Sequence, residues 1–333
     1  MLTRATVHTP NGVNPLLEGA VRYRHLALFI TDSCLLIPIF RREGNFMSTL
    51  IDGLSLGSIY ALIALGYTMV YGIAKMLNFA HGDIIMVGAY SIFSTLAFIG
   101  HPFVAILVAV VICTILGMTT EKLAYKPLRG ASPLAVLITA IGVSYLLQSV
   151  AQLIYGSKSQ PVTFISLGTI KLGDTQISGA AIVTLLIGAL IMVGLNFFVR
   201  KTRTGQAMQA VSEDRGAAQL MGINVNRIIT ITFAIGSALA AFASTFYLLQ
   251  ISAVSPTLGS MPGIKAFTAA VIGGIGSIPG AMLGGILLGV IEKICLSIDL
   301  LAPYTTAVEF TLLIIILLVK PTGILGKKIR EKV

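Results

Sequence analysis

The chain has 333 residues, of which 56% are hydrophobic and 11% charged, and its mean hydropathy is +0.92. A soluble domain carries roughly a quarter charged residues, so this composition excludes a soluble enzyme, a disordered regulator and a disulfide scaffold. It predicts an integral membrane protein, in which the net charge of +10 indicates basic cytoplasmic loops rather than a nucleic-acid partner.

The first 46 residues differ from the rest of the chain. They contain five arginines, which resist export, and Asp32 interrupts the apolar run from His25 to Phe40. This run is short for a span and lacks a small-residue cleavage site, so a signal peptide is not predicted. Two interpretations remain: a half-anchored segment, or an extension upstream of a translation start at Met47. We favour the second and assign 47–333 to one transmembrane domain.

Long apolar runs after Met47 predict a polytopic bundle of membrane-spanning helices. A helix needs about 20 apolar residues to cross a bilayer. Eight segments meet this requirement: 50–71, 84–100, 102–120, 133–154, 179–199, 228–250, 279–297 and 305–319. A shorter glycine-rich piece, 263–276, is expected to be a short or broken crossing that protein or water surrounds. We therefore predict an all-α membrane protein with about eight or nine spans and a short cytoplasmic helix.

The positions of lysine and arginine predict the orientation of these spans. Basic residues concentrate in the connections 121–132 and 200–227 and in the tail, and these regions, together with Lys75 after the first span, should face the cytoplasm. The opposite side carries only Lys158, Lys171 and Lys265, so the count is fourteen against three. This asymmetry places Met47 outside.

The first loop between spans, residues 72–83, holds Asn78, His81 and Asp83 close together. In one interpretation these residues line a pathway, and His81 and Asp83 hydrogen-bond each other or share a proton. In the simpler interpretation, which we favour, Asn78 or His81 caps the second span and Asp83 lies in its first turn.

Glycines four residues apart recur in the first and seventh spans. Such glycines share one helix face and let another backbone approach closely. We expect tight packing there, either inside the subunit or against a partner. The pairs are Gly53 with Gly57, Gly280 with Gly284, and Gly285 with Gly289.

The longest hydrophilic stretch, residues 201–227, predicts a short helix at the cytoplasmic surface. Ser212 is expected to cap it, with Glu213 and Asp214 in the first turn, where the helix dipole favours acids. Gly222 is expected to end it. Apolar and charged groups on the helix come from Arg215, Ala217, Ala218, Leu220 and Met221. Such a helix can dock into a groove of another protein; the alternative is a linker between two spans.

The sequence does not indicate catalytic or ion-coupling chemistry. It contains no GxxxxGKS or GxxxxGKT phosphate loop and no HExxH motif, and its three cysteines lie far apart. We expect no catalytic site, cofactor or metal. Asp52, Glu292 and Glu309 fall near span ends, so neither the buried carboxylate relay of an ion-coupled carrier nor a buried charge pair is predicted.

Several motifs together resemble a known family. The stretch AVSEDRGAAQLMGINV, residues 210–225, resembles the cytoplasmic coupling loop of ABC importer permeases. Residues 52–72, 77–83 and 270–280 are similar, in the same order, to motifs of the branched-chain amino acid permease family. The resemblance extends from Met47 to about Gly326.

This resemblance implies a permease subunit of an ATP-driven importer in the bacterial inner membrane, translocating leucine, isoleucine or valine by alternating access. It implies ATPase coupling through residues 212–222. The implied partners are a second permease subunit, two ATPase subunits, an extracytoplasmic binding protein and membrane lipid. ATP hydrolysis would belong to the ATPase subunits. The alternatives are an importer of urea, short amides or other amino acids, and an ion-coupled carrier or channel.

Overall fold

The computed structural model describes residues 43–165, 167–172 and 175–326. The chain divides into two units, Met1–Phe46 and Met47–Val333. The interpretation of the arginine-rich extension concerns residues that lie almost entirely outside the described ones.

Eight helices in the described part are long and apolar enough to cross a membrane. They follow the predicted spans closely, and three of them carry proline in the first turn, where its missing N–H is not needed. The helices are α3 (Glu43–Ala74), α4 (His81–Ile99), α5 (Pro102–Thr120), α6 (Pro133–Tyr155), α7 (Gly179–Lys201), α10 (Val225–Ile251), α12 (Ile278–Leu296) and α13 (Thr305–Val319). The prediction of a polytopic helical membrane protein is confirmed.

The glycine-rich piece between the sixth and seventh of these spans forms a separate helix, α11 (Ser260–Gly273), of 14 residues. At 1.5 Å per residue it is about 21 Å long, which is less than the roughly 30 Å hydrocarbon core of a bilayer. It packs against α4, α12 and α13. Gly274 and Gly276, with φ of 108° and 92°, then reverse the chain into α12.

The chain after α13 returns to this turn. The backbone N–H groups of Ile324 and Leu325 donate to the carbonyls of Ile272 and Gly273, at 2.8 and 2.9 Å. These carbonyls belong to the last turn of α11, where a helix leaves its acceptors without intrahelical partners. The tail therefore completes the hydrogen bonding at the end of α11.

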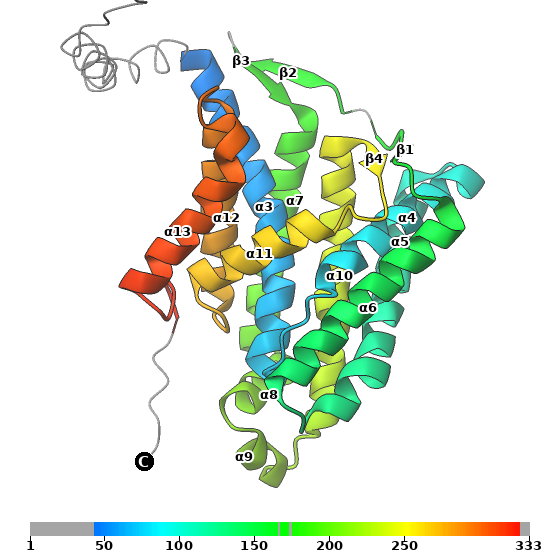
Figure 1. The fold of residues 1–333 in the computed structure, drawn as a ribbon, viewed down its shortest axis with the longest axis vertical. Coiled ribbons are helices and arrows are strands. Elements are labelled where there is room, and N and C mark those ends of the chain that lie inside the picture. Colours follow the sequence, from blue (N-terminus) through cyan, green and yellow to red (C-terminus); the bar gives the residue numbers. More distant parts are fainter. Residues whose placement is uncertain (1–42, 166, 173–174, 327–333) are drawn as a thin grey trace, which may run out of the picture. The chain divides into compact units, whose positions relative to one another are not determined.

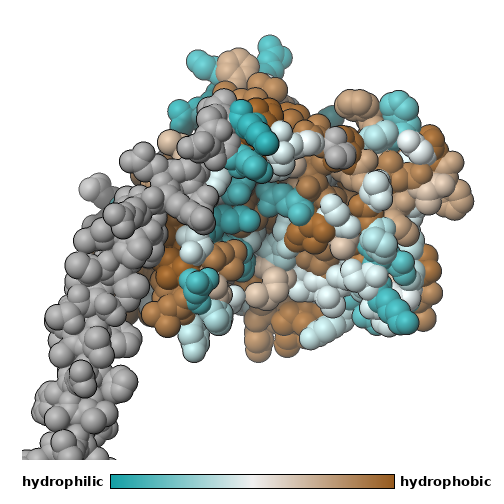
Figure 2. Space-filling model, turned by 90° about the horizontal axis from the view of Figure 1, so that it is seen from above, coloured by the Kyte–Doolittle hydropathy of each residue, from teal (hydrophilic) through white to brown (hydrophobic). Residues whose placement is uncertain are grey.

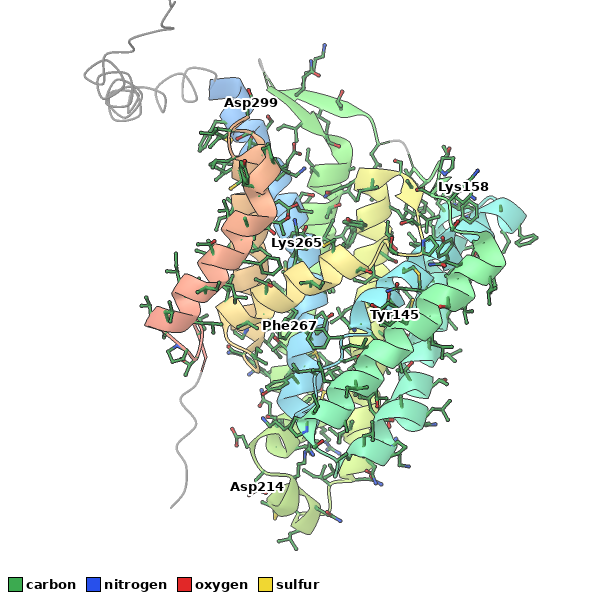
Figure 3. All side chains as sticks on the ribbon, in the orientation of Figure 1. Tyr145, Lys158, Asp214, Lys265, Phe267 and Asp299 are labelled. Atoms are coloured by element: carbon green, nitrogen blue, oxygen red, sulfur yellow. The ribbon has the colours of Figure 1, made fainter. Side chains whose placement is uncertain are left out.

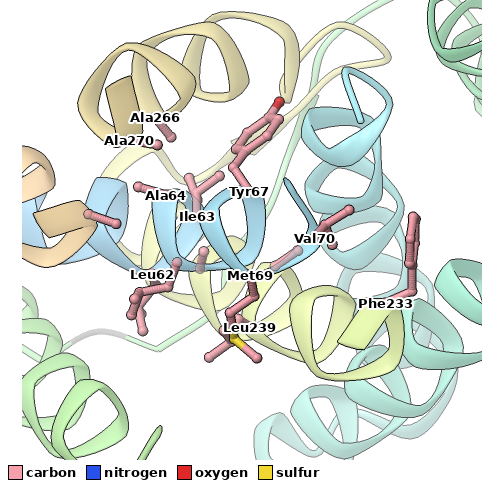
Figure 4. Packing of buried hydrophobic residues seen from close by; sticks show 14 of the residues in the cluster. Leu62, Ile63, Ala64, Tyr67, Met69, Val70, Phe233, Leu239, Ala266 and Ala270 are labelled. Atoms are coloured by element: carbon pink, nitrogen blue, oxygen red, sulfur yellow. The ribbon is translucent and has the colours of Figure 1, made fainter. Parts of the chain in front are cut away.

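The apolar core surrounds α3, which runs through the middle of the bundle (Figure 1). Leu62 and Ile63 of α3 are fully buried, and they pack with residues of α10, such as Leu239, and of α11, such as Ala266 (Figure 4). Helix α10 also packs against α4 and α5. The central helix is thus shielded from lipid on nearly all sides by its own subunit.

The two ends of the bundle differ in structure. At one end lie two short antiparallel ladders that the sequence did not predict (Figure 1): β1 (Gln160–Pro161) with β4 (Ala253–Val254), and β2 (Thr169–Leu172) with β3 (Thr175–Ser178). Figure 2 looks down on this end and shows hydrophilic residues among the hydrophobic ones.

At the other end lie α8 (Arg203–Glu213) and α9 (Arg215–Leu220). A π-helical turn (Glu121–Tyr125) and a 3-10 turn (Lys126–Leu128) follow α5 there. Arg129 donates to the side chain of Asn226 in the first turn of α10. The two basic connections that were predicted to face the cytoplasm therefore meet at one end of the bundle.

Candidate functional site

The connection between α7 and α10, which was predicted to be cytoplasmic, folds into two helices and not into the single one predicted. The hydroxyl of Thr202 caps α8 by accepting from the N–H of Gly205 at 3.0 Å. Met208 and Val211 of α8 are buried and anchor it to the core. Helix α8 is therefore packed against the bundle, and the shorter α9 follows directly from it.

Asp214 caps α9, because its Oδ1 accepts from the N–H of Ala217 at 3.0 Å. The prediction that Ser212 caps this helix was wrong. Ser212 and Glu213 are the last residues of α8, and the Ser212 hydroxyl donates back to a carbonyl of its own helix. The physical reason is the backbone: Asp214 has the extended conformation (φ −152°, ψ 112°) that a cap requires.

Helix α9 ends as the sequence predicts, near Gly222, whose φ is +82°. The N–H of Ile223 donates to the carbonyl of Ala218 and closes the last turn. Leu220 and Met221 are 90% and 83% exposed, and Ala217 is also exposed. Ala218 is buried and faces the bundle, so it belongs to the inner side of α9 and not to a docking surface.

Arg215 connects α9 to the centre of the bundle. Its guanidinium donates to the carbonyl of Ile73, in the last turn of α3, at 2.9 Å. Burial, together with the positive charge of Arg215, lowers the pKa of Lys75, which follows α3. Arg215 is therefore directed inward, and its hydrogen bond ties α9 to the last turn of the central helix.

The residues of the first loop have partners other than the predicted ones. Asn78 accepts a hydrogen bond from the hydroxyl of Tyr125 at 2.7 Å. His81 is buried beside Tyr67, with ring centroids 4.9 Å apart, and its Nε2 has no hydrogen-bond partner among the described residues. The expectation that Asn78 or His81 caps α4 was wrong, since the cap position is Ala80 and no side chain bonds there.

Asp83 lies in the first turn of α4, as expected, but its carboxylate is directed at α6. The Ser144 hydroxyl donates to its Oδ2, and the Gln148 amide donates to its Oδ1 at 2.8 Å. Among the described residues Asp83 does not bond to His81, so the predicted pair does not form. The carboxylate instead borders a cavity of about 320 Å³ between α4, α6 and α11.

A buried ionic cluster connects α11, α12 and α13. The ammonium of Lys265 lies 2.7 Å from Glu292 Oε1 and 3.1 Å from Glu309 Oε1. Tyr60 of α3 donates to Glu292 Oε2 at 2.8 Å. Lys265 is 8% exposed and Glu309 1%. Figure 3 shows Lys265 within the bundle, between Asp299 near one end and Asp214 at the other.

The expectation of no buried charge pair was therefore wrong. Lys265 was predicted to lie in an outer connection and the two glutamates near span ends. Their association was not predicted, because the direction in which these side chains point depends on how the helices pack. No three His, Cys, Asp or Glu side chains gather in the described ranges in a way that could hold a metal ion.

The glycine pairs of α12 lie on two faces of that helix. A Cβ at Gly285 would lie 2.4 Å from Ala61 of α3, and one at Gly289 would lie 2.2 Å from Gly57. A Cβ at Gly280 or Gly284 would instead meet the backbone of α11, at 2.4 and 2.1 Å. The backbones of α3, α12 and α11 are thus in direct contact inside one subunit. A Cβ at Gly53 of α3 would lie 2.9 Å from the Cα of Val290, so the contact between α3 and α12 extends to this residue.

Comparison with known proteins gives the family. The family model described as branched-chain amino acid transport system / permease component matches residues 49–317. The chain is 43% identical over 304 residues to the high-affinity branched-chain amino acid transport system permease protein BraD of Pseudomonas aeruginosa, covering 87% of this chain and 98% of BraD. It is also 43% identical to the corresponding permease protein LivH of Escherichia coli, covering 86% of this chain and 98% of LivH.

Among solved structures, PsaBC from Streptococcus pneumoniae is similar only weakly, with a TM-score of 0.40 and 16% identity over 82% of this chain and 89% of that one. The sequence matches carry the assignment. They cover nearly the whole of the relatives, and the described helices have the length and composition that a permease requires. The chain belongs to the branched-chain amino acid transport system permease family, and it is a multi-pass permease subunit of the inner membrane.

Proposed function

We propose that this chain is the transmembrane subunit through which an ATP-driven importer moves leucine, isoleucine and valine across the inner membrane. The names of BraD and LivH support this substrate class. The observation that carries the proposal is the α8–α9 unit, which holds two highly exposed apolar side chains, Leu220 and Met221, at the end where the basic connections meet. Exposed apolar groups beside charged ones suit a surface that another protein covers.

In this proposal the energy comes from two separate ATPase subunits, and α9 docks into a groove on one of them. Leu220 and Met221 supply the apolar contact, and the exposed Glu213 and Asp214 lie at its edge. A second, related permease subunit completes the pathway, and a soluble binding protein delivers the substrate from outside. ATP binding moves α9, and the hydrogen bond from Arg215 to α3 transmits that motion to the spans.

Docking is tested by replacing Leu220 and Met221 with aspartate in the whole transporter, reconstituted in liposomes with its ATPase and binding-protein partners. The spans are unchanged, so the variant should insert and keep basal ATP hydrolysis. It should lose both leucine uptake and the stimulation of ATPase activity by leucine-loaded binding protein. The matched control is Leu123→Asp, an exposed leucine at the same end but outside α8 and α9.

Three results would contradict the proposal. Normal coupling in the Leu220→Asp, Met221→Asp double variant would make α9 a linker. Leucine uptake by the native transporter that persists without ATP would indicate a carrier or channel instead. Uptake of urea or a short amide, with none of leucine, would assign the transporter to another substrate.

A further inference from the structure

The cavity between α4, α6 and α11 has the size and the mixed lining of a small-molecule site. Its volume is about 320 Å³, and small-molecule pockets span roughly 300–1,000 Å³. The Asp83 carboxylate forms part of its wall although the residue is only 2% exposed. An ionisable side chain inside a membrane-spanning bundle is costly, so it points to a functional role.

The groups that hold this carboxylate are all neutral. Ser144 and Gln148 each donate to one of its oxygens, and Gln148 Nε2 also lies 3.3 Å from the Ser260 hydroxyl on α11. The ion pairs found in the described ranges involve other residues, and none supplies a cation to Asp83. Both oxygens therefore act as acceptors, and among the described residues the charge has no counter-ion. Such a site favours a cationic ligand.

Apart from the hydroxyl groups of Tyr67 and Tyr145, the rest of the lining is apolar or consists of glycine backbone. Leu137, Ile141 and Ile264 form an aliphatic wall. Glycine lies where α4 and α11 touch, and a Cβ at Gly82 would lie 2.5 Å from the carbonyl oxygen of Gly259. No side chain fits between these two backbones, so no side chain projects into the cavity where α4 and α11 meet. The lining thus combines one anionic group with a surface suited to an aliphatic chain.

The cavity is accessible from outside the subunit. Tyr145 on α6 and Ile264 on α11 both line it and are both exposed, and Figure 3 shows Tyr145 on α6 close to α11. The cavity is therefore open at the surface of the subunit beside these two helices.

We propose that this cavity is a transit site for the amino acid, in which the Asp83 carboxylate receives the ammonium group and the Leu137–Ile141–Ile264 wall receives the aliphatic side chain. This inference deepens the proposed function and rests on it. Among the described lining residues there is no cation for the carboxylate of the amino acid. The site therefore binds one half of the zwitterion and holds its ligand weakly, as a step in a pathway requires.

The first test is Asp83→Asn in the whole reconstituted transporter supplied with leucine-loaded binding protein. This change keeps the size of the side chain and removes the charge, so leucine uptake should fall roughly ten- to hundredfold, as expected for the loss of one charge-assisted hydrogen bond. Stimulation of ATPase activity should remain, because α8 and α9 are unchanged. Uptake per ATP hydrolysed therefore falls. Asp83→Glu should restore part of it.

The matched control is Ser91→Ala, which removes a buried polar group of the same helix that bonds only its own Val87 carbonyl and lies outside the cavity. It should leave uptake per ATP unchanged. If Asp83 is only structural, Asp83→Asn will lower thermal stability, uptake and ATPase stimulation together. Normal uptake in Asp83→Asn would overturn the proposal directly.

The second test reads the charge of the cavity without relying on transport. A Ser260→Cys thiol should react with a cationic methanethiosulfonate faster than with an anionic one, by on the order of tenfold, and excess leucine should slow the reaction. Adding Asp83→Asn should abolish the preference. The background is measured in the chain without the new thiol, whose described cysteines, Cys113 and Cys295, are buried.

Equal reaction rates of the Ser260→Cys thiol with the two reagents would overturn the transit site. Protection of this thiol by sodium ions, with none by leucine, would overturn it too. The two proposals fail in different ways. If the proposed function is wrong, the native transporter shows no ATP-dependent leucine uptake, whatever the cavity does. If only the transit site is wrong, the native transporter takes up leucine while leucine gives no protection at residue 260.

Discussion

The contact between α3 and α12 leaves no room for a side chain, and Gly289→Ala tests how far the bundle depends on it. A Cβ at Gly289 would lie 2.2 Å from the nitrogen and 2.3 Å from the Cα of Gly57, whereas ordinary van der Waals contact begins at 3.4 Å. Both obstructing atoms belong to the backbone, so no rotamer change can relieve the clash. The two helices would have to separate by roughly 1 Å.

Overpacking of this kind costs about 1–3 kcal/mol, and an obstruction by backbone belongs at the upper end of that range. The higher helix propensity of alanine returns about 0.8–1 kcal/mol. We therefore expect a net loss of about 2 kcal/mol in the free energy of unfolding. The measurement is the midpoint of thermal unfolding of the purified subunit in detergent, followed by circular dichroism.

The matched control is Gly194→Ala on α7, where an added Cβ meets no atom within 4 Å. Only the helix propensity changes there, so this variant should be as stable as the native subunit or slightly more stable. The two alanines are thus expected to shift the midpoint in opposite directions. If Gly289→Ala unfolds at the same temperature as Gly194→Ala, close backbone packing does not explain the glycine pairs.

Three further predictions concern other parts of the chain. Gly222→Val should abolish the stimulation of ATPase activity by loaded binding protein, because a β-branched residue resists the φ of +82°. Gly222→Asn should retain the stimulation, because asparagine tolerates that φ, and an equal loss in both variants would contradict this explanation. Lys265→Met should lower the free energy of unfolding by about 3 kcal/mol, since it leaves the buried Glu309 and the partly buried Glu292 without their cation. Adding Glu292→Gln and Glu309→Gln should recover most of the thermal midpoint, and no recovery would show that charge is not the cause. A chain that begins at Met47 should insert and take up leucine like the full chain, and loss of uptake would refute the proposed start.

The spans were predictable because the bilayer itself fixes the length of an apolar segment. The segment predicted at 102–120 is observed as Pro102–Thr120, and most of the other spans differ by only a few residues. The Lys265 cluster was not predictable in this way. Its three charged side chains come from three helices, and only the packed structure determines which of their faces turn inward.

The candidate site was predictable in part. His81 and Asp83 are two residues apart on one helix, and residues at that spacing do not face each other, so the sequence itself contained an argument against the predicted pair. Ser144 and Gln148 are four apart and share a face of α6. That pair of polar residues in an apolar span was the available signal for the cavity. The sequence does not indicate that this face meets Asp83, 61 residues away.

The hydrogen bonds from Ile324 and Leu325 to the end of α11 have a consequence for biosynthesis. The carbonyls of Ile272 and Gly273 are synthesised with α11, but the N–H groups that satisfy them belong to a segment that follows α12 and α13 in the chain. During translation these acceptors must be solvated by water or by the insertion machinery, since lipid offers no donor. The α11–α12 hairpin therefore reaches its final hydrogen bonding only after α13 and the segment that follows it have been synthesised, which makes the docking of this segment a late step in the maturation of the permease.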